Sequence, residues 1–378
     1  MGYQPISGKI IILGITGSIA SYKSVDLASK LTQLGAEVDV ILTEAATKFI
    51  NPLTFQSVTG RQAYTDQDLW GDKAHILHVN LTKDADMLCI APITANTIAK
   101  LAHGFCNDLL SISALAIGTG KDSIPVIIAP AMDGNMFDHE ATQHNLNILI
   151  KRGYHITGPA MGHLASGLVA QGRMSEPIII LDKIRYLLSR TGPLRRKKIV
   201  VTAGGTREPI DPVRVITNLS SGKQGVAIAQ SALDYGADVV LISPPLDLSI
   251  PNDVVHKIAQ TAQEMQDAVL EETKNADVLI MAAAVADFRP KSYKTKKIKN
   301  KIKPLILELE PTPDILTLVS KRKQSSGTPR VTIGFAAETN DLLKNAQKKL
   351  NEKKLDMIIA NDVSAVNAGF SVDTNKVS

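Results

Sequence analysis

One pattern, written twice, constrains the fold of this chain more than any other feature. A short apolar run leads into a glycine-rich turn, then an amphipathic stretch, a glycine and a second apolar run. The first copy has apolar runs at 9–13 and 37–42 around the turn GITGSIA at 14–20, and the second has them at 198–201 and 238–242. Such a β-loop-α-β unit directs backbone N–H groups and a helix N-terminus at an anion, usually a phosphate. The sequence therefore predicts two phosphate-binding halves.

The other apolar and amphipathic segments continue the alternation of strands and helices. Strands are expected at 10–15, 37–42, 87–91, 125–129, 199–202, 238–242, 278–283, 331–335 and 356–360, and helices at 20–34, 94–103, 107–117, 141–151, 223–235, 261–275 and 340–353. Continuous apolar strands that alternate with helices favour parallel sheets covered on both faces. We therefore expect an α/β protein with two doubly wound, Rossmann-like domains. A Gly-, Pro- and Arg-containing stretch places them at 1–188 and 198–378, with a linker at 189–197.

Composition excludes several classes of protein. The 378 residues are 44% hydrophobic and 21% charged, as in soluble globular proteins. No apolar run approaches the roughly 20 residues that span a bilayer, and residues 1–9 lack the features of a signal peptide. These features predict a cytoplasmic protein with no membrane partner. The two cysteines, of which Cys89 lies in an apolar run, predict neither a disulfide framework nor a zinc site.

The formal charge of +5 is concentrated in the segment 291–303, KSYKTKKIKNKIK, which contains no acidic residue. Such a run is either a solvated loop or a surface that binds a polyanion. Aromatic residues make up only 4% of the chain, and it has no motif of a nucleic-acid reader. A nucleoside triphosphate is therefore a better candidate than nucleic acid.

In the first half, several segments are expected at the carboxyl edge of the sheet, where open α/β folds bind ligands. The loop 14–20 lacks the G-x-G-x-x-G spacing, so it indicates a phosphate near a helix start or only a structural turn. Thr94 and Asn96 follow the strand 87–91, although helix capping alone explains Thr94. The polar turn 130–136 follows the next strand.

Two further features of the first half have both a functional and a structural interpretation. His75 suits proton transfer near pH 7, but a single histidine beside an apolar stretch is as often structural. The glycine-rich segment 162–174 is either a flap over a site or an ordinary loop.

In the second half, the long loop 206–223 is rich in Arg, Asn, Ser and backbone N–H donors suited to an anion. The run MAAAVAD at 281–287 ends a strand with small side chains, which let a flat base or a phosphate approach the backbone, or only pack tightly in a core. Packing does not explain Asp287. The lysines that could neutralise a triphosphate as point charges are Lys297, Lys349 and Lys353.

Long motifs in both halves carry a resemblance to known enzymes. The longest is TAGGTREPIDPVRVITNLSSGKQG at 202–225, supported by AAAVADFRP at 282–290, GFAAETN at 334–340 and ANDVS at 360–364. GITGSIASYK at 14–23, APITANTIAK at 91–100 and PAM at 130–132 are similar to the flavin-dependent cysteine decarboxylases. Over almost its whole length, the chain resembles the bifunctional phosphopantothenoylcysteine decarboxylase / phosphopantothenate–cysteine ligases of coenzyme A biosynthesis.

The resemblance implies an N-terminal domain of the flavin-dependent cysteine decarboxylase type that binds FMN. A hydride passed from the substrate thiol to the flavin would create an electron sink, so that the carboxylate leaves as CO2 before the hydride returns. His75 matches the catalytic histidine of the family. The implied FMN site consists of Gly17, Ser18, Ile19, Ala20, Thr43, Thr94, Ala95 and Asn96.

Two catalytic candidates depart from the family pattern. Asp133 stands where the family has an asparagine that holds the substrate carboxylate, and a charged Asp133 would repel that group. Ser166 stands where a flap cysteine donates a proton in the last reduction, and a hydroxyl is a far weaker acid than a thiol. Together, the two departures suggest either a branch of the family with a modified reduction step or a decarboxylase that stalls at an oxidised product.

The resemblance implies a C-terminal, CTP-dependent ligase domain. It would activate 4'-phosphopantothenate as an acyl-cytidylate, from which cysteine displaces CMP, and magnesium is expected with the triphosphate. The implied catalytic residues are Asn218, Arg214, Ala284 and Lys297. The implied CTP site consists of Met281, Ala282, Ala283, Asp287, Lys297, Pro313, Asp314, Ile315, Leu316, Phe335, Lys349 and Lys353.

Family members assemble through trimeric decarboxylase and dimeric ligase contacts, so a homo-oligomer is expected. They also continue beyond the position of Ser378, so the ligase is expected to be short at its C-terminus. A nicotinamide-dependent oxidoreductase is an alternative favoured only by the paired loops and disfavoured by the missing G-x-G-x-x-G. An FMN-binding protein with one active half, or with a non-enzymatic regulatory role, is favoured by Asp133 and Ser166.

Overall fold

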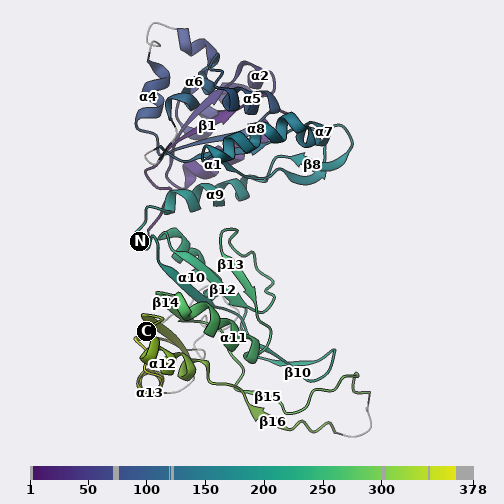
Figure 1. Ribbon diagram of the computed structural model, residues 1–378, viewed down its shortest axis with the longest axis vertical. Coiled ribbons are helices and arrows are strands. Elements are labelled where there is room, and N and C mark those ends of the chain that lie inside the picture. The colour runs from purple at the N-terminus through teal and green to yellow at the C-terminus, as the bar shows by residue number, and fades with distance from the viewer. Residues whose placement is uncertain are drawn as a thin grey trace. The chain divides into compact units, whose positions relative to one another are not determined.

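The computed structural model describes residues 3–70, 76–118, 120, 123–299, 304–338 and 341–362. The chain divides into two units, Met1–Ser189 and Arg190–Ser378, each built on its own parallel sheet (Figure 1). Both sheets have the order 3-2-1-4-5-6 when the strands of each are counted along the chain. This is the order of doubly wound, Rossmann-like sheets, so the predicted fold class is confirmed.

All neighbouring strands in the sheet of the first unit are parallel, in the order β3-β2-β1-β4-β5-β6. The strands are β1 (Ile10–Ile15), β2 (Glu37–Leu42), β3 (Ala63–Thr65), β4 (Met87–Ile93), β5 (Val126–Pro130) and β6 (His155–Ile156), and a separate hairpin pairs β7 (Ala160–His163) with β8 (Val169–Arg173). The helices are α1 (Ser21–Gln33), α2 (Glu44–Thr47), α3 (Pro52–Thr59), α4 (Leu77–Lys83), α5 (Ala95–His103), α6 (Leu109–Ala116), α7 (Gly134–Asp138), α8 (Glu140–Lys151) and α9 (Pro177–Ser189), with a 3-10 turn at Asp66–Trp70.

Helices cover both faces of this sheet, which explains why its strands are apolar without interruption. Successive strand residues point to opposite faces. Ile11 and Leu13 pack in one core with Phe55 of α3, whereas Ile12 packs in the other with Leu110 of α6. These side chains are all fully buried, and each contributes about 1.5–3 kcal/mol of hydrophobic stabilisation.

The sheet of the second unit repeats this topology in the order β13-β12-β9-β14-β17-β18. Its strands are β9 (Lys198–Thr202), β12 (Asp238–Ser243), β13 (Val255–Ile258), β14 (Val278–Met281), β17 (Val331–Glu338) and β18 (Met357–Asp362). The helices are α10 (Lys223–Asp234), α11 (Ala262–Glu272), α12 (Ile315–Ser326) and α13 (Leu342–Glu352), with a 3-10 turn at Thr273–Asn275. Two short hairpins pair β10 (Arg207–Pro209) with β11 (Val215–Thr217), and β15 (Phe288–Pro290) with β16 (Leu309–Pro311).

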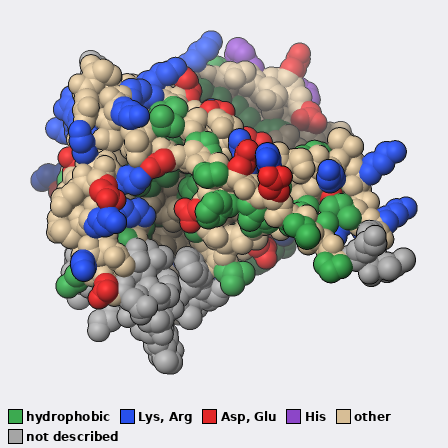
Figure 2. Space-filling view, turned by 90° about the horizontal axis from the view of Figure 1, so that it is seen from below, with side chains coloured by type: hydrophobic (Ala, Val, Ile, Leu, Met, Phe, Trp, Pro, Cys, Tyr) green, Lys and Arg blue, Asp and Glu red, His purple; other side chains and the backbone are tan. Residues whose placement is uncertain are grey.

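The β15–β16 hairpin is the base of an arm that leaves the body of the second unit (Figure 1). Figure 2 shows Lys, Arg and hydrophobic side chains gathered on this arm at the right of the view. The described part of the lysine-rich stretch, residues 291–299, runs along the arm.

Several expected boundaries were wrong. Ser189, placed in the linker, is the last residue of α9. The segment 162–174 belongs to the β7–β8 hairpin rather than to a loop, and its strands are largely exposed, so they lack an apolar period. The expected strand 278–283 ends at Met281, and the helix expected at 261–275 ends at Glu272. The helices α2, α3, α4, α7, α9 and α12 were missed.

Two other sequence predictions concern the interior and the membrane. Cys89 is fully buried in β4, and burial raises the pKa of its thiol to about 12, so it is a core residue as expected. Among the described residues, no helix is both long enough and apolar enough to cross a bilayer.

Candidate functional site

The loop between β1 and α1 has the features of a phosphate site. It contains Gly17, Ser18, Ile19 and Ala20 and leads into the thirteen-residue helix α1. This helix begins without a side-chain cap and has no acidic residue in its first turn, so its N–H groups and dipole suit an anion. Glycine is required at position 17, where the loop passes close to Ala45, because a Cβ built there lies 2.6 Å from the Cβ of Ala45. This donor set fits a ligand phosphate.

Thr16 joins this loop to the end of the neighbouring strand β4. Its hydroxyl donates to the carbonyl of Pro92 at 2.9 Å and accepts from the N–H of Thr94 at 3.0 Å. Thr94 in turn caps α5. All eight residues of the predicted flavin site therefore lie at one edge of the sheet, in the β1–α1 loop (Gly17, Ser18, Ile19, Ala20), at the cap of α2 after β2 (Thr43) and at the start of α5 (Thr94, Ala95, Asn96). His75 lies outside the described residues.

Asp133 and Ser166, the two departures from the family pattern, contact each other. The Ser166 hydroxyl donates to Oδ2 of Asp133 at 2.5 Å, while Oδ1 accepts from the N–H of Asn135 at 3.1 Å and so caps α7. The β7–β8 hairpin is held against this turn, because the N–H of Met132 donates to the carbonyl of Gly172 at 3.0 Å. A Cβ at Gly172 would collide with that turn at the carbonyl oxygen of Met132. Close backbone packing thus brings Ser166 to Asp133.

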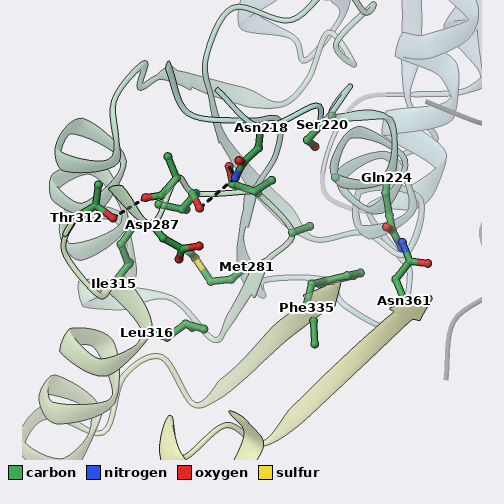
Figure 3. Close-up of a pocket in the computed structure, with 18 of the residues that line it drawn as sticks. Asn218, Ser220, Gln224, Met281, Asp287, Thr312, Ile315, Leu316, Phe335 and Asn361 are labelled. Atoms are coloured by element: carbon green, nitrogen blue, oxygen red, sulfur yellow. Dashed lines mark hydrogen bonds between the residues drawn. The ribbon is translucent and has the colours of Figure 1, made fainter. Parts of the chain in front are cut away.

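The second unit contains a cavity of about 770 Å³ at the carboxyl ends of β14 and β17 (Figure 3). Its volume lies in the range of roughly 300–1,000 Å³ that is typical of small-molecule sites. The predicted residues that line it are Asn218, Met281, Ala282, Ala283, Ala284, Asp287, Pro313, Asp314, Ile315, Leu316, Phe335, Lys349 and Lys353. The structure therefore gathers residues from sequence-distant segments into one site.

Two threonines of the β9 side hold the wall of this cavity in place. The hydroxyl of Thr202 accepts from the N–H of Ala283 at 3.1 Å, and that of Thr206 accepts from the N–H of Ala286 at 2.9 Å. Both threonines are fully buried. These two hydrogen bonds hold the small-residue run 281–287 against the loop that follows β9. The small side chains of the run leave the cavity open.

Asn218 lies at the centre of the cavity wall, with its side chain at the small-residue run (Figure 3). Its side-chain amide donates to the carbonyls of Ala284 and Val285, each at 3.3 Å. The chain can reach this position only with glycine at 205, because a Cβ there would lie 2.5 Å from the carbonyl oxygen of Asn218. Gly205 therefore allows the loop to place the Asn218 side chain at the cavity wall.

The two ends of the cavity differ in chemistry. At one end, α10 begins after Gly222 without a side-chain cap, and its first turn faces the cavity. Gln224 and Asn361 point toward one another at this end, and Asp287 and Thr312 lie at the opposite end (Figure 3). The dipole of a helix that begins at the cavity suits an anionic ligand group at this end.

Two lysines add positive charge to the cavity. Lys349 donates to the carbonyl of Phe335 at 2.8 Å, and Lys353 pairs with Asp314. Burial raises the pKa of Asp314, but hydrogen bonds from Lys353 and Thr317 outweigh that effect and lower it. The Asp314 carboxylate thus stays ionised at neutral pH and holds Lys353 at the cavity wall.

Arg214 and Lys297, two predicted catalytic residues, are not among the described residues that line the cavity. Arg214 lies at the tip of the β10–β11 hairpin and pairs with Asp211 at 2.6 Å. Lys297 lies on the arm, next to Ile298, whose carbonyl accepts from Arg214 at 2.7 Å. The structure therefore brings Arg214 to the backbone beside Lys297 rather than to the cavity.

The carboxylate of Asp211 should make the second unit sensitive to acid. Burial raises its pKa, but hydrogen bonds from the N–H groups of Ile298 and Val213 and from Arg214 lower it to about 2, against an ordinary value of 3.8. A depressed folded-state pKa stabilises the fold above about pH 4, and that contribution is lost as the pH falls toward 2. We expect the urea midpoints of the wild type and Asp211→Asn to differ most at pH 7 and to converge below pH 4; a constant difference would contradict this.

Thr312 and Asn361 are among the cavity residues that the sequence did not predict. Thr312 donates to the carbonyl of Ala286 and, through its own N–H, to the carbonyl of Asp287 at 2.9 Å. Asn361 is the penultimate residue of β18 and is buried in the cavity wall. The motif ANDVS contains Asn361, so the signal was present, but no role was drawn from it. Thr312 precedes the predicted Pro313 and carried no signal of its own.

Both halves match known protein families. Residues 3–189 match the family described as "Flavoprotein", and residues 194–378 match "DNA/pantothenate metabolism flavoprotein C-terminal domain". The "Coenzyme A biosynthesis bifunctional protein CoaBC" of Bacillus subtilis (strain 168) is 43% identical over 376 residues, covering 99% of this chain and 90% of that protein.

Two solved structures are each similar to a part of the chain. "Crystal structure of the C-terminal Domain of Coenzyme A biosynthesis bifunctional protein CoaBC" is 46% identical, with a TM-score of 0.40, and covers 45% of this chain and 79% of that one. "The FMN binding protein AtHal3" is 31% identical, with a TM-score of 0.42, and covers 47% of this chain and 95% of that one. With the near-full-length relative, the two family matches show that this chain belongs to the family of coenzyme A biosynthesis bifunctional proteins.

Proposed function

We propose that the second unit joins 4'-phosphopantothenate to cysteine with CTP, and that the first unit decarboxylates the product to 4'-phosphopantetheine. The domains would be a decarboxylase at 1–188 and a ligase at 198–378. The observation that carries the ligase assignment is the cavity, which combines Asn218, an uncapped helix N-terminus and two lysines. The "Flavoprotein" match and the phosphate-site features of the β1–α1 loop support FMN in the first unit.

The ligase chemistry needs an anion site and a polar group at the reacting carboxylate. In the first half-reaction, a carboxylate oxygen of 4'-phosphopantothenate would attack the α-phosphorus of CTP and pyrophosphate would leave. Mg²⁺, when bound with CTP, would neutralise part of the triphosphate charge. In the second, the amino group of cysteine attacks the acyl carbon and CMP leaves. Asn218 would stabilise the charge at the acyl group, and the lysines Lys349 and Lys353 would orient the nucleotide.

In the first unit, the residues Gly17 to Ala20 would hold the FMN phosphate, and Thr94 to Asn96 would flank the flavin. FMN, when bound, supplies a reversible hydride acceptor for the substrate thiol. The protein positions the substrate, excludes water and moves protons, which is the role we assign to Asp133, Ser166 and the undescribed His75. We further propose a cytoplasmic homo-oligomer that acts on small molecules rather than on nucleic acid or membranes.

Mass spectrometry of one reaction tests both halves. The full-length protein is incubated with 4'-phosphopantothenate, cysteine, CTP and Mg²⁺. We expect 4'-phosphopantetheine, CMP and pyrophosphate to accumulate. Phosphopantothenoylcysteine alone, or a decarboxylated product two hydrogens short, would locate a failure in the first unit and favour the FMN-binding protein with one active half. No conversion of 4'-phosphopantothenate would reject the ligase assignment.

Replacing Asp133 by asparagine should strengthen substrate binding. The change removes a negative charge from the place where the substrate carboxylate is proposed to bind, and asparagine still caps α7. At an exposed site such a repulsion costs about 0.2–1 kcal/mol. We therefore expect KM for phosphopantothenoylcysteine to fall several-fold in Asp133→Asn, as measured by CO2 release.

The matched control is Asp138→Asn, an exposed carboxylate at the other end of α7, which should leave KM unchanged. A higher KM in Asp133→Asn would instead assign Asp133 to a group that binds a cation or carries a proton. The same turnover assay on Ser166→Cys reports whether a more acidic proton donor at this position speeds the last reduction.

A further inference from the structure

The tip of the β10–β11 hairpin forms hydrogen bonds with residues 291–299, the described part of the lysine-rich stretch. We call these residues the lysine segment. The N–H of Ile298 donates to Oδ2 of Asp211 at 3.1 Å, and the carbonyl of Ile298 accepts from Nη2 of Arg214 at 2.7 Å. Nearby, the N–H of Lys294 donates to the carbonyl of Ile210 at 3.1 Å. Both backbone groups of Ile298 are thus held by one Asp–Arg pair.

Asp211 is the centre of this contact. Its Oδ1 accepts from the N–H groups of Val213 and Arg214 at 2.9 and 3.0 Å, which closes the hairpin tip. Its Oδ2 accepts from Nε and Nη2 of Arg214 at 3.0 and 2.6 Å, in addition to Ile298. The Asp211 side chain is fully buried, whereas 41% of the Arg214 side chain is exposed. Every acceptor position of a buried carboxylate is therefore used to arrange one loop tip and one segment of the arm.

The lysine segment needs such an anchor. It carries five lysines and no acidic residue, so mutual repulsion favours extended and solvated conformations. The pair of Lys291 with Glu308 at 2.7 Å holds the base of the segment, but both side chains are mostly exposed, and pairs of this kind contribute little. The buried Asp211 contact lies at the other end, next to Lys297.

We propose that Asp211 is a positioning residue of the ligase: it fixes Arg214 and Lys297 as one preset pair of cations. This inference rests on the proposed ligase function and on the CTP contact that the family resemblance implies for Lys297. Asp211 itself touches neither substrate nor nucleotide. Asp211 restricts the positions that Lys297 can occupy. Binding of a triphosphate then loses less conformational entropy, because the segment is already ordered.

Limited trypsin digestion of the full-length protein measures the anchor without any substrate. In Asp211→Asn, an amide replaces a carboxylate that accepts five hydrogen bonds, so we expect cleavage after Lys294, Lys296 and Lys297 to become at least about tenfold faster. Glu308→Gln is the matched control, since it removes a charge from the arm without touching the anchor, and its cleavage rate should change by less than about twofold. Equal cleavage of the wild type and Asp211→Asn would overturn the proposal.

Ligase kinetics then separate positioning from a general structural role. We expect Asp211→Asn to raise KM for CTP about five- to tenfold with kcat within about twofold of the wild type. In a Lys297→Ala background, the same substitution should have almost no additional effect, because its consequence is transmitted through Lys297. Multiplicative effects of the two substitutions would contradict the proposal.

A second variant tests the proposal if Asp211→Asn does not fold. If circular dichroism shows that Asp211→Asn lacks a folded second unit, Arg214→Lys serves instead, since lysine keeps the charge but cannot bond Asp211 and Ile298 together. The same trypsin result is expected of it. A wild type that forms no phosphopantothenoylcysteine would defeat the ligase function and this role with it, while the trypsin result would still report whether Asp211 holds the segment.

Discussion

The Asn218→Ala variant is expected to lose about 10²- to 10³-fold in the rate of phosphopantothenoylcysteine formation. Asn218 lies at the centre of the cavity wall, and its amide reaches the carbonyls of Ala284 and Val285. Removal of one preorganised donor at a reacting acyl group costs a factor of this size in other acyl-transfer enzymes. Alanine fits without strain, so the cavity should keep its shape and CTP affinity should change little.

The measurement is the rate of phosphopantothenoylcysteine formation under saturating substrates, with CTP binding followed by calorimetry. Gln263→Ala removes an exposed amide from α11, away from the cavity, and serves as the control with an unchanged rate. Decarboxylation of added phosphopantothenoylcysteine should be normal in both variants. A loss smaller than tenfold, or an equal loss in both half-activities, would remove Asn218 from the proposed chemistry.

Replacing Gly17 by valine should remove the flavin and leave the ligase intact. A Cβ at this position already lies 2.6 Å from the Cβ of Ala45, so the larger side chain must displace the phosphate loop or α2. Overpacking of this kind costs about 1–3 kcal/mol, which corresponds to roughly 5- to 150-fold weaker binding if the strain falls on the loop that holds the ligand. Decarboxylation should fall in proportion to the bound flavin.

Visible absorbance of the purified protein reports the bound flavin, and the two half-activities are assayed separately. Ser29→Ala, at a partly exposed position of the same helix α1, should keep both the colour and the activity. Ligase activity of Gly17→Val should stay within about twofold of the wild type, since the cavity lies wholly in the second unit. Full flavin content in Gly17→Val would show that the phosphate does not use this loop.

The secondary structure that the sequence predicted best is the buried part. The strands β1, β2 and β12 begin where expected, because apolar runs buried on both faces have a strong and simple signal. The β7–β8 hairpin was missed for the opposite reason: its strands are largely exposed, and a backbone contact between Met132 and Gly172 joins it to the rest of the unit. A contact between segments forty residues apart leaves no periodic trace in either of them.

The sequence by itself determined the repeated β-loop-α-β plan and predicted many residues of the two proposed sites, because glycines, small residues and caps are required at fixed places along the chain. Only the tertiary structure decided which of them meet. It gathered Asn218, Asp287 and Lys353 into one cavity, but paired Arg214 with the backbone beside Lys297 on the arm. Ser166 reached Asp133 only because a hairpin docks there. The physical reason is that strand order and hairpin docking are settled by burial and hydrogen bonding across the fold, which no local pattern encodes.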